Sequence, residues 1–166
     1  EKVYTVLAQS NFYTVMAQAY EDVALFGTAP VIIYEDVEDV IRCYLPCAGE
    51  YYLAASSRLS VDTLYREFNL TVIQIVEQFQ IENCPPQIVQ LWQAGGASLD
   101  MEWVVAHAIE PNFPVSGRGT KIAPAAFVPE SFAYREVYWL RGNKTDAPLS
   151  KRGFHAAPFM AARWST

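Results

Sequence analysis

The residues best suited to chemistry are four carboxylates within five positions: Glu35, Asp36, Glu38 and Asp39. Hard cations bind where several carboxylate oxygens converge on one point. This run lies between two β-rich segments, however, and we expect a turn whose side chains splay apart, without the spacing of an EF-hand loop. We interpret the run as a hydrated turn. The alternative is a small metal-dependent phosphodiesterase or nuclease-like protein that uses these carboxylates and nearby bases.

The other candidate groups form no recognisable catalytic constellation. Residues 117–121 contain the residue types of a phosphate loop, but in the wrong order for a Walker motif. His107 stands in an apolar run, which favours a satisfied core or edge histidine over a general base. No serine or cysteine occupies a nucleophile elbow, and nothing pairs obviously with His107 or His155. The sequence therefore predicts no catalytic residue, no cofactor and no metal.

The three cysteines, Cys43, Cys47 and Cys84, form no CxxC pair and match no common zinc-ligand spacing. We interpret them as small buried hydrophobic side chains in a reducing compartment. The chain begins with Glu1 rather than Met and has no basic-then-apolar leader, so we expect an excised fragment of a longer protein.

The composition predicts a globular protein. The chain has 166 residues, of which 52% are hydrophobic and 18% charged, and that is too apolar for a disordered chain. Its net charge of −6 argues against a general nucleic-acid binder, which is usually basic. The longest apolar run, residues 23–34, is interrupted by a glycine and a proline and is too short to cross a bilayer.

The charge is distributed unevenly along the chain. Residues 118–166 hold eight of the 12 basic residues and three of the 18 acidic ones, a net of +5, whereas residues 1–117 carry −11. Such polarity predicts complementary surfaces within the fold or between copies of it. Between copies, we expect Arg118 and Lys121 to face the acidic residues at 35–39.

Hydrophobic periodicity places the first elements. Apolar residues recur on one helical face over residues 12–26, with Ser10 or Asn11 as the cap and Gly27 as the stop. Residues 3–7 extend this pattern as an earlier turn of the same helix. Two pairs of extended runs follow, at 31–34 with 40–45 and at 51–54 with 61–68, each joined by a polar turn.

Two short helices and further strands complete the pattern. Thr71 and Gln74 have capping-box spacing, and Pro86 is well placed to begin a helix that Gly95 ends. Strands are expected at 101–109 and 132–140, a long loop at 110–129, a polar hairpin at 141–152 and a last apolar stretch at 154–164. The predicted fold class is α+β: mostly antiparallel strands and hairpins, with an N-terminal helix and two short inserted helices, in a single domain over residues 1–166.

The apolar faces of these segments predict the core. We expect nine side chains to be mostly buried: Phe12, Met16, Val23, Ile33, Tyr52, Leu64, Val76, Val105 and Trp164. Truncation of a fully buried Phe12 or Trp164 to alanine is expected to cost about 3–5 kcal/mol.

Several phrases, taken together and in order, resemble one protein family over nearly the whole chain. They are Ser10-Asn11-Phe12, Phe26-Gly27-Thr28-Ala29, Gly49-Glu50-Tyr51-Tyr52-Leu53-Ala54, Val61-Asp62-Thr63-Leu64-Tyr65-Arg66-Glu67-Phe68, Leu70-Thr71, His107-Ala108-Ile109-Glu110-Pro111-Asn112, Gly153-Phe154, Pro158-Phe159 and Arg163-Trp164. The chain resembles the bacteriophage head-to-tail connecting proteins, which are the portal proteins of short-tailed, podovirus-type phages. The cysteine-rich phrase at 43–47 departs from what we expect of the family.

The resemblance implies a structural role rather than an enzyme. Portal proteins form a dodecameric ring at one capsid vertex, through which double-stranded DNA is packaged by the terminase and later ejected. The implied partners are other copies of the chain, the major capsid protein, the terminase, a tail adaptor and scaffolding proteins, with no sequence-specific DNA contact and no membrane. The implied location is the virion, after assembly in the bacterial host cytoplasm. The chain would be part of the wing, with the stem, clip and crown absent, and no catalytic residue is implied.

Overall fold

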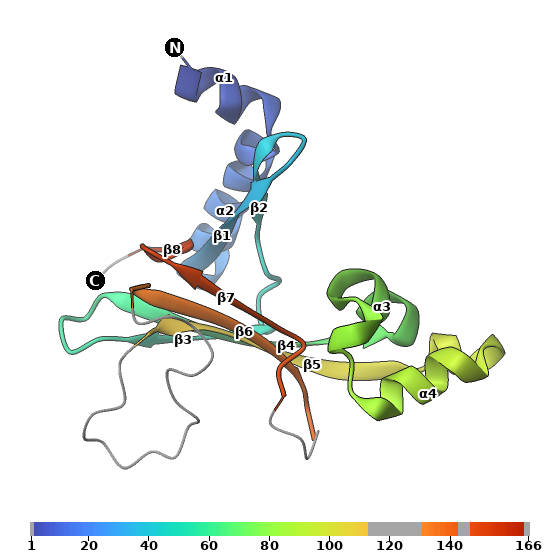
Figure 1. The fold of residues 1–166 in the computed structure, drawn as a ribbon. Helices are drawn as coiled ribbons and strands as arrows, with labels where there is room; N and C mark the ends of the chain where they lie inside the picture. The colour runs from blue at the N-terminus through green and yellow to red at the C-terminus, as the bar shows by residue number, and fades with distance from the viewer. Residues whose placement is uncertain (1, 113–130, 143–146, 165–166) are drawn as a thin grey trace. The chain divides into compact units, whose positions relative to one another are not determined.

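The computed structural model describes residues 2–112, 131–142 and 147–164, and these residues fall into two compact units. The first unit contains residues 1–51 and 157–166, and the second contains residues 52–156. Each unit carries its own antiparallel sheet, helices and core (Figure 1). The described chain is α+β with mainly antiparallel strands, as the sequence predicts. The sequence-based expectation that residues 1–166 form a single domain stays a prediction, because the division into two compact units does not test it.

The first unit packs two helices against a three-stranded sheet. Helix α1 (Lys2–Gln9) and helix α2 (Phe12–Phe26) precede β1 (Thr28–Asp36) and β2 (Val40–Tyr44). Strand β8 (Phe159–Arg163) returns to the free side of β1, so that the strand order is β2-β1-β8. The core of the unit is small and consists of Val15, Ala19, Ala29, Val31 and Cys43.

The boundary between helix and strand in this unit follows from one glycine. Gly27 adopts φ = +77°, a left-handed conformation that disfavours other residues, and its N–H donates to the carbonyl of Val23 at 2.9 Å. Helix α2 therefore ends where the sequence predicts. The expectation of a single N-terminal helix is wrong, because the chain bends at Ser10 and Asn11 and makes α1 a separate helix.

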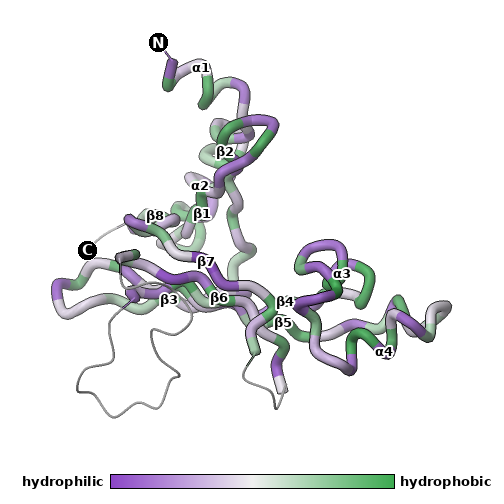
Figure 2. The backbone as a smooth tube through the Cα atoms, viewed as in Figure 1, coloured by the Kyte–Doolittle hydropathy of each residue, from purple (hydrophilic) through white to green (hydrophobic). Residues whose placement is uncertain are grey.

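The second unit is built on a five-stranded sheet with the strand order β3-β4-β5-β6-β7. Its strands are β3 (Tyr51–Ala55), β4 (Val61–Thr71), β5 (Glu102–Pro111), β6 (Tyr134–Leu140) and β7 (Ser150–Phe154). Helices α3 (Val72–Phe79) and α4 (Pro86–Ala94) follow β4, with short 3-10 turns at Ile81–Asn83 and Gly96–Asp100. In Figure 2 both helices carry hydrophobic and hydrophilic segments, as expected for helices with one buried face.

The predicted helix signals are confirmed in this unit. The hydroxyl of Thr71 accepts from the backbone of Gln74 at 3.3 Å, and the side chain of Gln74 accepts from the backbone of Thr71 at 2.9 Å, which completes the capping box. Pro86 begins α4, and Gly95 follows its last residue. The buried core of the unit consists of Val72, Ile75, Phe79, Cys84, Ile88, Val105, Tyr138, Leu140 and Leu149.

The predicted core is confirmed in part. Leu64 and Val105 are fully buried, and five further side chains are half-buried and pack against the two cores: Phe12, Met16, Val23, Ile33 and Val76. Tyr52 and Trp164 are 70% and 76% exposed, so those two predictions are wrong. Tyr52 lies on edge strand β3 and alternates away from its half-buried neighbours. Trp164 is fixed only by its backbone N–H, which donates to the Gly27 carbonyl at 3.0 Å.

Candidate functional site

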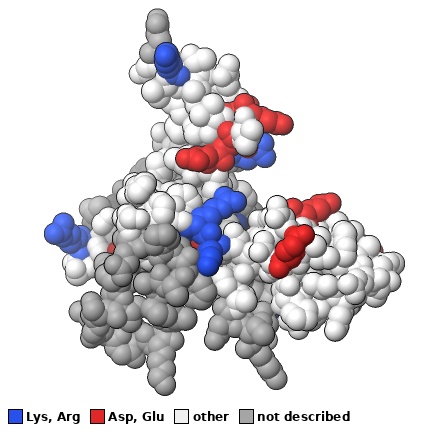
Figure 3. Space-filling view, viewed as in Figure 1, with Lys and Arg blue, Asp and Glu red and all other residues white. Residues whose placement is uncertain are grey.

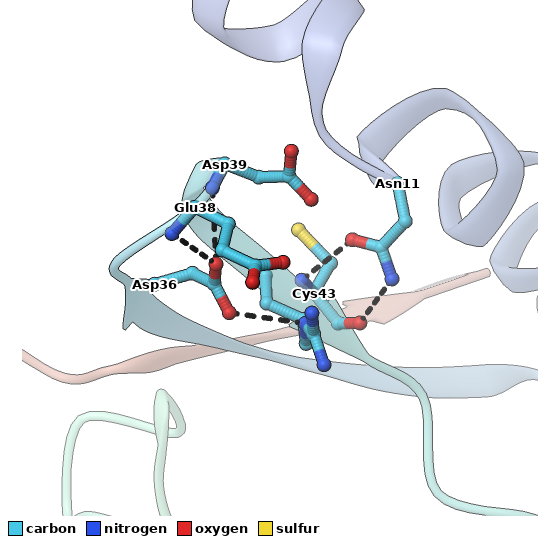
Figure 4. A network of polar contacts seen from close by, with 6 residues as sticks. Asn11, Asp36, Glu38, Asp39 and Cys43 are labelled. Carbon is cyan, nitrogen blue, oxygen red and sulfur yellow. Dashed lines mark hydrogen bonds and ion pairs between the residues drawn. The ribbon is translucent and has the colours of Figure 1, made fainter.

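The acidic run forms a turn that is held by one of its own carboxylates. Oδ1 of Asp36 accepts hydrogen bonds from the backbone N–H of Glu38 at 2.9 Å and of Asp39 at 3.0 Å (Figure 4). Oδ2 of Asp36 lies 3.2 Å from Nε of Arg42. The N–H groups of Asp39 and Glu38, followed by the charge of Arg42, hold the pKa of Asp36 below its ordinary value. This carboxylate is thus engaged in closing the β1–β2 hairpin.

The remaining carboxylates do not gather around Asp36. Figure 4 shows the carboxylate of Asp39 pointing away from that of Asp36, and Figure 3 shows acidic side chains spread over the β1–β2 hairpin. Over residues 2–112, 131–142 and 147–164, no three His, Cys, Asp or Glu side chains meet in a group that could hold a metal ion. The structure thus favours the turn over the nuclease-like alternative, for which it offers no support.

Asn11 joins the start of α2 to the outer edge of β2. Its Nδ2 donates to the carbonyl of Cys43 at 2.8 Å, and its Oδ1 accepts from the N–H of Cys43 at 2.8 Å (Figure 4). These are the two hydrogen bonds that a neighbouring strand would make. Because the side chain is used in this way, it forms no cap on α2; the N–H of Phe12 donates to the Ser10 hydroxyl at 3.2 Å instead.

A buried polar cluster crosses three central strands of the larger sheet. Arg66 on β4 and His107 on β5 are register partners, and His107 and Tyr138 on β6 are register partners in turn. Nε of Arg66 donates to Nδ1 of His107 at 2.9 Å, and Nε2 of His107 lies 2.9 Å from Oε1 of Glu136. The Tyr138 hydroxyl donates to the same Glu136 oxygen at 3.2 Å. All four residues are buried.

The geometry fixes the protonation state of His107. Since Nδ1 accepts from Arg66, the ring proton is on Nε2 and is donated to Glu136, so that a neutral imidazole links a cation to an anion. The ring also stacks on Tyr138, with centroids 4.0 Å apart and planes 3° from parallel. Burial lowers the pKa of His107, and Arg66 acts in the same direction against the opposing effect of Glu136. The interpretation of His107 as a satisfied core histidine is confirmed.

The opposite face of the same strands carries a second set of cross-strand contacts. Glu110 on β5 accepts from Nε and Nη2 of Arg135 on β6, at 2.8 and 2.6 Å. It also accepts from the Tyr65 hydroxyl on β4 at 2.6 Å. Burial, followed by the hydrogen bond to Glu110, raises the pKa of Tyr65. Further along, Nη1 of Arg141 donates to Glu67 at 3.0 Å.

Strands β4, β5 and β6 are thus tied together through side chains on both faces, in addition to their backbone ladders. Sliding of one strand past another would break contacts on both faces, because a slip by one residue moves every side chain to the other side of the sheet. The arrangement stiffens the sheet and specifies its register. Its residues on β4 and β5 belong to two of the phrases that carry the family resemblance, at 61–68 and 107–112, whereas those on and just after β6 belong to none. The sequence interpretation did not connect Arg66, Glu110 or Glu136 with these roles.

The other candidate groups contribute little to a site. Cys43 and Cys84 are buried as predicted, whereas the prediction for Cys47 is wrong, since Cys47 lies exposed after the end of β2. The loop residues 117–121, with Arg118 and Lys121, lie outside the described residues, so the expected contact with the acidic run is not tested. None of the described helices is long and apolar enough to cross a membrane.

The second unit therefore contains a sheet whose strands are cross-linked through their side chains, and comparison with known proteins identifies the family of the chain. The chain belongs to the bacteriophage head to tail connecting proteins, whose family model matches residues 1–166. It is 35% identical over 159 residues to the "Portal protein" of Salmonella phage epsilon15, and 32% identical over 161 residues to the "Probable portal protein" of Bordetella phage BPP-1. Each match covers 96% of this chain and 27% of the relative, so the chain spans about a quarter of the length of these curated relatives. The resemblance seen in the sequence is confirmed.

Proposed function

We propose that this chain is a structural segment of a phage portal, the ring through which DNA enters the capsid and leaves it. The observation that carries the proposal is the family match over all 166 residues, together with the two portal relatives at 32–35% identity. Strands tied together through both faces of the sheet suit a segment that must keep its shape while DNA is packed under pressure.

The finer features of the proposal follow from the family. The segment lies in the wing of a dodecameric ring, and its two units serve there as one domain. The ring contacts the major capsid protein, the terminase, a tail adaptor and scaffolding proteins, and DNA passes through it without sequence-specific contact. The protein assembles in the host cytoplasm, resides in the virion, and has no enzymatic activity of its own.

Assembly of the intact protein tests this function. The polypeptide that carries these 166 residues is purified and examined by native mass spectrometry and negative-stain electron microscopy. We expect closed rings, with twelve copies as the main species and a central channel. A protein that stays monomeric under all assembly conditions, or that forms open filaments instead of rings, would contradict the proposal.

A further inference from the structure

The outer surface of α2 carries an apolar stripe that no described element of the chain covers. Tyr13, Ala17, Tyr20 and Ala24 fall at i, i+4, i+7 and i+11, within roughly 60° of the helix circumference, and all four are exposed. The opposite side of the helix packs on β1 and β2 through Val15 and Ala19. Alternating small and aromatic residues suit close packing against another surface, because the alanines admit a neighbour between the tyrosine rings.

The neighbouring helix also leaves apolar side chains exposed. Helix α1 has eight residues and buries none of them, and its Val3 and Tyr4 are exposed. A helix this short is marginal in isolation, so a surface that covers it adds to its stability. Contiguous exposed apolar patches often mark interaction surfaces.

The charge beside the stripe indicates what kind of surface it fits. Helix α2 contains Glu21 and Asp22 and no basic residue. Glu21 is exposed, adjoins the tyrosines, and forms no ion pair with any residue that the structure describes. The matching partner is therefore a surface with exposed basic groups, which pair with a carboxylate and stack on tyrosine rings.

The chain itself carries such a surface on β7. This outer strand of the five-stranded sheet contains no acidic residue, and its Arg152 is exposed, whereas the neighbouring Lys151 points to the other face of the sheet. Within the described ranges Arg152 makes no ion pair. A ring of identical copies needs two different and complementary patches on each copy, because its contacts are head to tail. The α2 stripe and β7 meet that requirement.

We propose that the α2 stripe of one copy docks on strand β7 of a second copy in the ring, with Glu21 facing Arg152 and the tyrosine rings packing against the Arg152 side chain. The proposal rests on the ring function proposed above, and it adds the two surfaces through which neighbouring copies meet.

Chemical cross-linking tests which surfaces meet. Two differently tagged forms of the intact protein are co-expressed, one with Ala17→Cys and the other with Ser150→Cys, on the same face of β7 as Arg152, and both with the exposed Cys47 replaced by serine. A short bismaleimide is expected to join the two forms covalently within assembled rings, and neither form to itself. A covalent dimer of the Ala17→Cys form alone would mean that the stripe meets itself. A third form carries both introduced cysteines in one chain. If the reagent joins these two cysteines only within a single chain, no second copy is involved. Either result overturns the proposal.

A charge exchange tests the pairing. Glu21→Arg and Arg152→Glu are each expected to weaken ring association about tenfold at low salt, and the two together to restore it to within about threefold of the parent. Glu77→Arg on α3 is the control for the two charge reversals. Tyr20→Ala tests the stripe itself, and its control is Tyr52→Ala, because the two tyrosines are exposed to nearly the same extent, 68% and 70%. Rings that form normally but show neither the mixed cross-link nor the rescue overturn this contact and leave the portal function standing. A protein that forms no rings overturns both.

Discussion

Arg66 and His107, on neighbouring strands, are joined by a hydrogen bond of 2.9 Å from the guanidinium Nε to Nδ1 of the imidazole. On its other side, the imidazole contacts the carboxylate of Glu136. Replacing the ring removes one hydrogen bond from a buried cation and one from a buried anion, while Glu136 keeps its contact with the Tyr138 hydroxyl.

His107→Ala is therefore expected to reduce the free energy of unfolding by about 3–5 kcal/mol, because each charged neighbour loses a buried hydrogen bond and the missing ring leaves a cavity. Urea denaturation of the 166-residue chain, followed by circular dichroism, measures the change. Glu67→Ala is the matched control, since it removes the largely exposed pair with Arg141 and should cost about 0–1 kcal/mol. If the two substitutions lowered the free energy of unfolding equally, the buried cluster would contribute no more to stability than the exposed ion pair does.

The stability of the chain is expected to fall on acidification from pH 7.5 to 5. Burial holds the pKa of His107 below its ordinary value of 6.5 in the folded state, so the unfolded chain takes up a proton in this range and the folded chain does not. Uptake by the unfolded state favours unfolding. The denaturation midpoint, measured at intervals of half a pH unit, should fall as the pH is lowered, and this dependence on pH should become shallower in His107→Gln. In the control His155→Gln, which alters an exposed histidine outside the cluster, the slope should persist.

Asn11→Ala is expected to expose the edge of β2. The substitution removes both part-buried hydrogen bonds to the backbone of Cys43, and the loss of two such bonds costs about 1–3 kcal/mol. Amide hydrogen exchange at Cys43 should accelerate, with little change in β4 and β5. Asn69→Ala, which removes a bond between exposed side chains, serves as the control and should leave the exchange of Cys43 unaltered. An unchanged exchange rate at Cys43 in Asn11→Ala would contradict the assigned role.

The purified chain is expected neither to cleave nucleic acid nor to hydrolyse nucleotides, with or without Mg²⁺, Mn²⁺ or Ca²⁺. The reason is that Asp36, the central carboxylate of the acidic run, is engaged in its own turn and with Arg42. Plasmid nicking and phosphate release measure the two activities. Divalent-dependent nicking that disappears in an Asp36→Ala/Asp39→Ala double variant would revive the nuclease-like alternative.

Much of the secondary structure was predictable because local rules govern it. The helix stop at Gly27, the capping box of Thr71 and Gln74, and the start of α4 at Pro86 each depend on neighbouring residues alone. The exposure of Tyr52 and Trp164 was not predictable in this way. A strand pattern does not reveal which face of an edge strand is covered, and an apolar residue at a strand end can be held by its backbone only.

The buried cluster was missed for a different reason, since its members are far apart in sequence. A signal was nevertheless present. Arg66 stands two residues after the fully buried Leu64, and His107 stands between Val105 and Ile109 at the same spacing of two. Glu136 likewise stands two residues before the buried Tyr138 on β6. A polar side chain on the inward side of a strand needs a hydrogen-bonding partner. Arg66, His107 and Glu136, one on each of three strands, are therefore expected to pair with one another.

The return of β8 to β1 has a consequence for the order in which the protein can form. Thr28 pairs with Arg163, and the whole of the second unit lies between these residues in the chain. During synthesis, the ribosome releases α1, α2 and the β1–β2 hairpin long before it releases β8, while the second unit has all its strands available by residue 156. We expect α1, α2 and the β1–β2 hairpin to remain an incomplete sheet, with one side of β1 open to other chains, until β8 emerges. In a cell making many copies at once, that interval is when mispairing between nascent chains is most probable.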